Sequence, residues 1–161
     1  MGNNEVQGHW PGSCFGCSSG NPKGLQLRFS HTDEGCVTSC TIPDTYCGFE
    51  GLVHGGIIAT LLDEAAGWSL FARIGRLGVT REMTTRYLKP VPTNTEIRVE
   101  GTIMSSDDRS AVVRSTIHST DGTLLAEGES TWAFPRLGRI ASLANVPEGA
   151  LQQFLDDCCR K

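Results

Sequence analysis

The stretch GLVHGGIIATLLDEAAGWSLF, residues 51–71, constrains the fold more than any other part of this 161-residue chain. Its apolar residues recur at helical spacing, and one face alone holds Ile57, Leu61, Ala65, Trp68 and Ala72. Only a narrow stripe is polar or small, formed by Thr60, Asp63, Glu64 and Gly67. We therefore predict a helix from about residue 53 to residue 74 that is embedded in the core, with one thin edge free.

Strand patterns lie on both sides of this helix. Two alternating stretches precede it, at residues 24–30 and 36–42. Four follow it, at residues 79–90, 95–104, 111–119 and 123–134, and a short helix is expected at residues 146–159. Short polar turns between strands favour antiparallel pairing. The order of elements predicts an α+β fold in which one antiparallel sheet packs on one long helix, and dimerisation would cover the remaining sheet edges.

Composition narrows the class of protein. The net charge is −4 and the Lys and Arg residues are scattered, which argues against nucleic acid as a partner. The first twelve residues have no apolar core of a secretory signal, and no apolar run is long enough to cross a membrane. The odd count of seven cysteines favours reduced thiols, so we expect a cytoplasmic protein. We divide the chain into a lead-in (1–23), one domain (24–140) and a C-terminal helix packed on that domain (141–161).

The start of the long helix offers one possible site. Gly55 and Gly56 leave no Cβ in the way of a ligand, and the first N–H groups of a helix lack intrahelical partners. Such groups can hold a developing oxyanion, although a tight loop-to-helix turn is the simpler explanation of the motif. His54 could act as a general base, but a histidine at a helix start more often caps or packs.

Two adjacent carboxylates interrupt the same helix. Asp63 and Glu64 point about 100° apart, so both cannot lie equally well on the narrow stripe. We expect one in a cleft and the other capped by a partner or facing a second subunit. A desolvated carboxylate can serve as a base or nucleophile, and it can equally be a structural group in an interface.

The cysteines allow a metal hypothesis without favouring it. Cys14 and Cys17 form a single C-x-x-C, and zinc needs further ligands. Cys36 and Cys40 could supply them if the N-terminal loop folds back over the sheet. Small buried thiols are the favoured interpretation, and we expect no metal and no cofactor.

Basic residues on or near the strands can be interpreted in two ways, as solubilising surface groups or as ligands for phosphate. Arg86, Lys89, Arg109 and Arg114 are expected in or beside the sheet. Exposed strand cations usually keep a protein soluble, but near a pocket they can bind phosphate groups.

Three motifs give the chain a resemblance to a known family. GLVHGGIIATLLDEAAGW, VTREMTTRYLKPVP and GTLLAEGESTWAF resemble the hotdog-fold acyl-CoA thioesterases, most nearly the phenylacetate-pathway-like branch. The similarity spans about residues 20–134, and the lead-in CFGCSSGNPKGLQLRF also resembles that of some members. The resemblance implies an antiparallel sheet wrapped around a central helix, joined edge to edge into dimers that often pair into tetramers.

The resemblance also implies roles for particular residues. Asp63 matches the catalytic carboxylate, as general base or nucleophile, and Thr80 matches the residue that helps to position the attacking water. Gly56 matches the oxyanion donor. Substrate-binding roles are assigned to His54, Gly55, Cys47, Glu64 and Arg81. Several relatives carry an Asn or Gln upstream of the H-G-G motif, where this chain has Cys47 and Gly48.

The predicted function is hydrolysis of an acyl-CoA thioester by a homo-oligomer. The thioester carbonyl would lie on the N–H of Gly56, and Asp63 of the facing subunit would drive water into it. Two alternatives stay open: a non-catalytic acyl-CoA or CoA-binding module, and an acyl-thioester hydratase or dehydratase.

Overall fold

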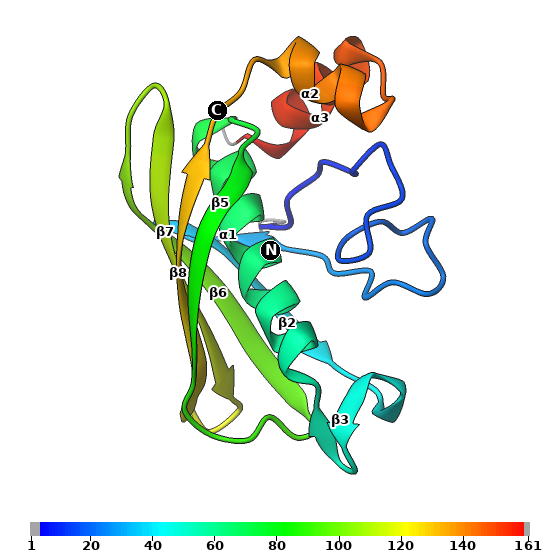
Figure 1. The fold of residues 1–161 in the computed structure, drawn as a ribbon, viewed down its shortest axis with the longest axis vertical. Helices are drawn as coiled ribbons and strands as arrows, with labels where there is room; N and C mark the ends of the chain where they lie inside the picture. Colours follow the sequence, from blue (N-terminus) through cyan, green and yellow to red (C-terminus); the bar gives the residue numbers. More distant parts are fainter. Residues whose placement is uncertain (1–3, 160–161) are drawn as a thin grey trace.

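A computed structural model describes residues 4–159 of the chain. One antiparallel sheet forms one side of the molecule, and a long helix packs on it (Figure 1). The strands lie in the order β1 (Ser30–His31), β2 (Gly35–Thr41), β6 (Glu96–Ser106), β7 (Ser110–Ser119), β8 (Leu124–Ala133) and β5 (Val79–Tyr87). Every neighbouring pair is antiparallel. The antiparallel pairing is the one expected from the short turns, whereas the order of the strands in the sheet was not predicted.

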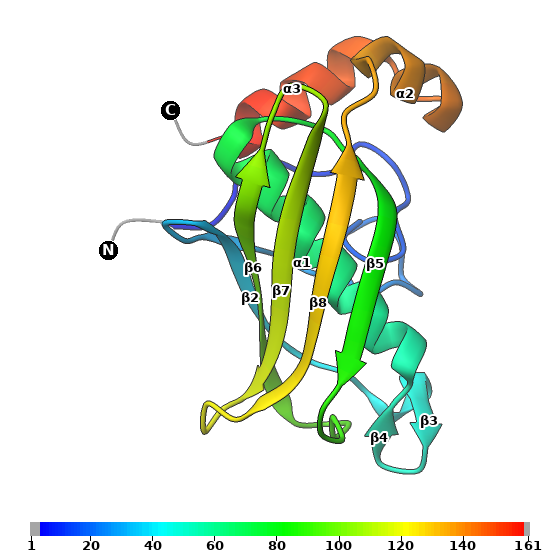
Figure 2. The same cartoon turned by 60° about the vertical axis from the view of Figure 1, so that its left-hand side comes forward.

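The long helix α1 (Gly55–Ile74) crosses one face of this curved sheet (Figure 2). It begins two residues later than predicted, because His54 is its N-cap, and it ends at Gly75 in the left-handed conformation. Before it lie the one-turn helix η1 (Asp44–Tyr46) and a small hairpin of β3 (Cys47–Phe49) and β4 (Leu52–Val53). Two further helices, α2 (Leu137–Ala144) and α3 (Glu148–Cys158), cover one end of the sheet and of α1. None of the helices in residues 4–159 is long and apolar enough to span a bilayer.

A close approach between α1 and the sheet depends on glycine. Gly101 of β6 faces the helix, where an added Cβ would overlap with the carbonyl oxygen of Ala65 and with the Ser69 hydroxyl. The Ser69 hydroxyl also accepts a hydrogen bond from the N–H of Cys36, at 3.2 Å. The helix therefore lies close to the backbone of the sheet at this point, and the small Ser69 side chain bridges the two.

Replacing Gly101 with Ala is expected to lower the free energy of unfolding by about 1–3 kcal/mol, because the added methyl must push α1 away from β6. Urea unfolding measures the loss. Gly149→Ala is the matched control, because Gly149 is an exposed helical position with nothing near its absent Cβ, and a small gain in stability is expected there. Equal effects of the two substitutions would contradict the close packing.

The face of α1 that turns away from the sheet is covered by the N-terminal segment, residues 4–29 (Figure 1). Trp10 of this segment packs in parallel with Phe71 and edge-on against Phe154 of α3. Arg28 ties the segment to itself by donating to the carbonyl oxygens of Val6 and Gly8. The thin free edge predicted for the helix is therefore largely covered by its own chain.

Two sequence expectations differ from the structure. Residues 24–30 were predicted to form a strand, but of these only Ser30 belongs to one. Leu27 and Phe29 are buried as the alternation requires, yet the backbone partner of Leu27 is Gly16 of the N-terminal segment, so no ladder forms. Helix α2 was not predicted, and the boundary expected at residue 140 falls inside it.

Candidate functional site

Asp63 of α1 and Thr80 of β5 form a hydrogen-bonded pair. The Thr80 hydroxyl donates to Oδ1 of Asp63 at 2.7 Å. The pair lies in a cavity of about 410 Å³, called here the Asp63 cavity, between α1, β5 and the N-terminal segment. Its lining is Trp10, Cys14, Cys17, Asp63, Glu64, Gly67, Trp68, Phe71, Gly78, Val79, Thr80 and Trp132. A carboxylate with a fixed hydroxyl partner thus faces a cavity whose lining includes four aromatic side chains.

Burial affects both carboxylates of this cavity. Desolvation raises the pKa of Asp63, and the hydrogen bond from Thr80 offsets part of that rise. Desolvation, reinforced by the neighbouring Cys14, raises the pKa of Glu64 to about 8. Glu64 Oε1 accepts a hydrogen bond from Sγ of Cys14 at 3.4 Å. One carboxylate was expected in a cleft and the other capped by a partner or facing a second subunit; both line the same cavity, and Glu64 is capped by Cys14.

The start of α1 forms a separate region. His54 Nδ1 accepts a hydrogen bond from the N–H of Gly56 at 2.9 Å, so His54 caps the helix as the simpler interpretation had it. Tyr87 donates its hydroxyl hydrogen to the carbonyl oxygen of Gly55 at 3.0 Å. A second cavity of about 570 Å³, the helix-start cavity, is lined by Gly48, Phe49, Leu52, Val53, His54, Gly55, Ile58, Tyr87, Leu88, Lys89, Pro90 and Val91.

The predicted site residues therefore divide into groups. Asp63, Thr80 and Glu64 line the Asp63 cavity, whereas His54 and Gly55 line the helix-start cavity. Gly56 and Asp63 are seven residues apart on one helix, a rise of roughly 10 Å. They cannot contact one carbonyl group from within a single chain.

Two predicted substrate-binding residues lie outside both groups. Cys47 pairs with Val53 in the small hairpin and is half-buried, without lining the helix-start cavity. Arg81 follows Thr80 at an irregularity in the β5–β8 ladder and lines a small cavity with Glu82 and Thr131. Neither residue is brought to Asp63 by the fold of one chain.

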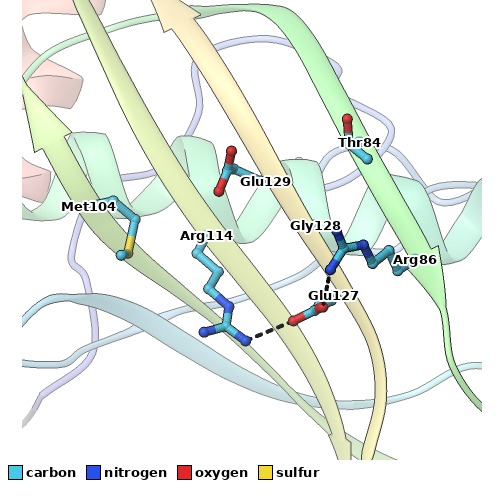
Figure 3. A pocket seen from close by; sticks show the side chains of 7 residues that line it. All are labelled: Thr84, Arg86, Met104, Arg114, Glu127, Gly128 and Glu129. Carbon is cyan, nitrogen blue, oxygen red and sulfur yellow. Dashed lines mark hydrogen bonds and ion pairs between the residues drawn. The ribbon is translucent and has the colours of Figure 1, made fainter.

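A further cavity lies on the outer face of the sheet, away from α1 (Figure 3). Arg86 and Arg114 both donate to the carboxylate of Glu127, at 3.3 and 2.7 Å, and Glu129 lies nearby. The positive charges are matched by the carboxylates around them. These arginines are therefore engaged with carboxylates, which weakens the phosphate-binding interpretation for this pair.

The C-x-x-C motif lies beside Glu64, a contact that was not predicted from the sequence. Cys14 and Cys17 line the Asp63 cavity, and an added Cβ at Gly16 would overlap with the Glu64 carboxylate. The Cys17 thiol and nearby backbone N–H groups lower the pKa of Cys14 to about 5, while the pKa of Cys17 is raised by Cys14 and by burial. The glycine between the two cysteines was the only sequence signal for this close contact.

Comparisons with known proteins agree with this architecture. The family model of the thioesterase superfamily matches residues 50–126. The acyl-coenzyme A thioesterase THEM4 of Rattus norvegicus is 35% identical over 74 residues, which cover 46% of this chain and 31% of that protein. The aligned part thus spans less than a third of that curated relative.

Solved structures share the fold. A thioesterase superfamily protein is 29% identical with a TM-score of 0.66, over 70% of this chain and 56% of that one. A thioesterase protein of Streptococcus pneumoniae, solved with coenzyme A, is 20% identical with a TM-score of 0.63, over 68% of this chain and 85% of that one. The α+β hotdog fold, an antiparallel sheet wrapped around a long helix, is confirmed. The chain is similar to the thioesterase superfamily over residues 50–126 and shares the fold of its solved members, as its motifs indicated.

Proposed function

We propose that the chain is an acyl-CoA thioesterase that uses Asp63 and Thr80 to direct water onto the thioester carbonyl. The observation that carries the proposal is the 2.7 Å hydrogen bond between these two side chains in a cavity with aromatic walls. The name of the rat relative and the coenzyme A bound to the Streptococcus pneumoniae protein support the same substrate class.

The chemistry needs one base and one place for negative charge. The Asp63 carboxylate accepts a proton from water as the water oxygen bonds to the thioester carbon. The second oxygen of the carboxylate is held by Thr80, which fixes the orientation of the base. The carbon–sulfur bond then breaks, and the thiolate of CoA leaves and is protonated, so that the products are a carboxylic acid and a free thiol.

The developing oxyanion is assigned to the N-terminus of α1, at the N–H of Gly56 with Gly55 beside it. The N–H of Gly56 donates a hydrogen bond to the ring of His54 in this structure. That hydrogen bond must break before the N–H can bind a thioester carbonyl. His54 therefore has a role at the entrance to the site. The helix start and Asp63 must come from different copies, because they lie roughly 10 Å apart on one helix.

A second copy has a surface to bind. β5 ends the sheet, and no strand within residues 4–159 pairs with its outer edge. Most of its residues are exposed, Val79 and Tyr87 among them, and Leu88 just beyond it is exposed too. Long exposed edges are usually covered in native proteins. A homodimer joined along β5 and α1 would cover this edge and bring Asp63 of one copy toward the helix start of the other.

A mixed dimer tests this arrangement. Asp63→Asn removes the base and Gly56→Pro removes the N–H donor within the first helical turn, where proline is tolerated. Each variant alone is expected to be inactive. A heterodimer of the two, isolated through two different tags, should regain about half of the wild-type activity, because one of its two sites is intact.

The control is a heterodimer of wild-type chain with a chain carrying both substitutions. Each of its sites lacks one group if the sites are shared, so it should be inactive. Half activity in this control, with none in the first heterodimer, would show that each chain holds its own site. A monomer in analytical ultracentrifugation would also contradict the shared site.

One observation favours a non-catalytic acyl-CoA-binding module as the second candidate. The Gly56 N–H is already engaged by His54, and Cys47 and Gly48 stand where several relatives carry an Asn or Gln. A panel of aliphatic and aryl acyl-CoAs with thiol detection separates the two functions. Release of free thiol supports the thioesterase, whereas calorimetric binding of CoA without any release supports the binding module.

A further inference from the structure

The C-x-x-C motif and Glu64 form a cluster that the proposed hydrolysis does not use. The ligand atoms of Cys14, Cys17 and Glu64 all lie within 4.8 Å of one another. Within residues 4–159 this is the one group of three or more His, Cys, Asp or Glu side chains close enough to hold a metal ion. Cys36 and Cys40, the partners considered from the sequence, are not part of it.

The cluster lacks a positive partner. No Lys, Arg or His of the described residues forms an ion pair with Glu64. Its acidic neighbours in the same cavity are Cys14, whose thiol contacts the Glu64 carboxylate, and Asp63. Three acidic groups gathered in a mostly buried place are costly unless a cation offsets them.

The local backbone is arranged to hold a thiolate. The N–H of Gly16 donates to Sγ of Cys14 at 3.3 Å, and the N–H of Ser18 donates to the carbonyl oxygen of Cys14 at 3.1 Å, which closes the turn. The indole N–H of Trp68, which lines the same cavity, is buried without an acceptor among the described residues. A metal-bound Cys17 sulfur would offer that N–H an acceptor.

We propose that Cys14, Cys17 and Glu64 bind one zinc ion, whose fourth coordination position opens into the Asp63 cavity. Bond lengths of about 2.3 Å to sulfur and 2.0–2.2 Å to oxygen give a tetrahedral sulfur–oxygen separation of roughly 3.5 Å. The observed separation of Cys14 Sγ and Glu64 Oε1 is 3.4 Å. All three residues line the cavity, which leaves the fourth position to a water molecule. The zinc ion fastens the N-terminal segment to α1 and makes it a fixed wall of the cavity.

Metal binding by the reduced full-length chain tests the site directly. Zinc content is measured by mass spectrometry after purification without chelator, and affinity by competition with a chromophoric chelator. One zinc per chain is expected. Cys14→Ser, Cys17→Ser and Glu64→Gln should each weaken binding at least tenfold, since even groups that only orient a ligand typically contribute about 10–100-fold. Cys40→Ser and the exposed Glu129→Gln are the controls and should bind as the wild type does.

A second pair of variants tests the geometry without touching a ligand. Gly16→Ala should weaken zinc binding at least tenfold, because its methyl overlaps with the Glu64 carboxylate. Gly20→Ala should not, because its methyl would make only an ordinary contact with Ser18. Cobalt titration of the wild type adds a readout that needs no variant, since thiolate ligation gives a sulfur-to-cobalt charge-transfer band.

Three results would overturn the site: no charge-transfer band in the reduced wild type, zinc affinity unchanged by the ligand substitutions, or a Cys14–Cys17 disulfide that takes up no metal after reduction. These readouts are independent of hydrolysis. A chain that binds zinc and cleaves no thioester would remove the proposed function and leave the metal site standing.

Discussion

Asp63→Asn is expected to lower kcat for acyl-CoA hydrolysis by about 10²–10⁴-fold, with a much smaller effect on KM. Asparagine keeps an oxygen that can accept the hydrogen bond from Thr80, so the local geometry survives while the proton acceptor is lost. The measurement is thiol release under steady-state conditions with the best substrate of the panel. Unfolding curves of variant and wild type establish that the fold is intact.

The matched control is Asp156→Asn. Asp156 is an exposed helical aspartate whose carboxylate accepts a hydrogen bond from Gln152, and it does not line the Asp63 cavity. Its replacement should leave kcat unchanged. A kcat for Asp63→Asn within a factor of three of the wild type would exclude Asp63 as the base, even if the chain is a thioesterase.

Trp68→Ala is expected to lower the free energy of unfolding by about 3–5 kcal/mol. Trp68 is almost fully buried, and its ring stacks on Phe29 and meets Phe71 and Phe154 edge-on. These contacts join the N-terminal segment, α1 and α3, so the truncation loosens three parts of the chain at once. Urea unfolding followed by circular dichroism measures the change.

Leu143→Ala controls for the loss of a large apolar side chain. Leu143 lies on α2 and is 79% exposed, so its truncation should change stability by no more than about 0.5 kcal/mol. A loss below about 1 kcal/mol for Trp68→Ala would mean that the site collapses around the missing ring, and that the aromatic contacts do not carry the stability assigned to them.

The sequence predicted the elements whose patterns are long. The helix at residues 53–74 and the strands after it were found within a few residues, because apolar periodicity over ten or more positions leaves few alternatives. Residues 24–30 have the alternation of a strand, but whether they form one depends on which backbone segment lies beside them. Here Phe15 and Gly16 accept from Leu25 and Leu27, and no periodicity predicts that pairing.

Helix α2 was missed for a different reason. It has only eight residues, no side chain caps its start, and it follows Pro135 and contains Gly138, residues that do not favour a helix interior. Its signals were Leu137, Ile140 and Ala141 at helical spacing, followed by Asn145 in the left-handed conformation that ends helices. A short helix that is stabilised by tertiary contacts has only a weak periodic pattern in its sequence.

The candidate site was predictable in part. Asp63 and Thr80 were paired by resemblance to a family, and their hydrogen bond agrees with that pairing while their catalytic role stays a prediction. Cys14 and Glu64 are fifty residues apart in the sequence, and they meet because the N-terminal loop folds back onto α1. The position of such a loop depends on the whole fold and cannot be predicted from the neighbouring residues alone.

The contact between Trp10 and Phe154 has a consequence for biosynthesis. The two rings come from opposite ends of the described chain, so the segment that leaves the ribosome early must wait for α3 before its packing is complete. Until then the aromatic face of α1 is uncovered on that side, and a chaperone or a second nascent chain can reach it. The packing of residues 4–29 is therefore complete only once α3 is in place.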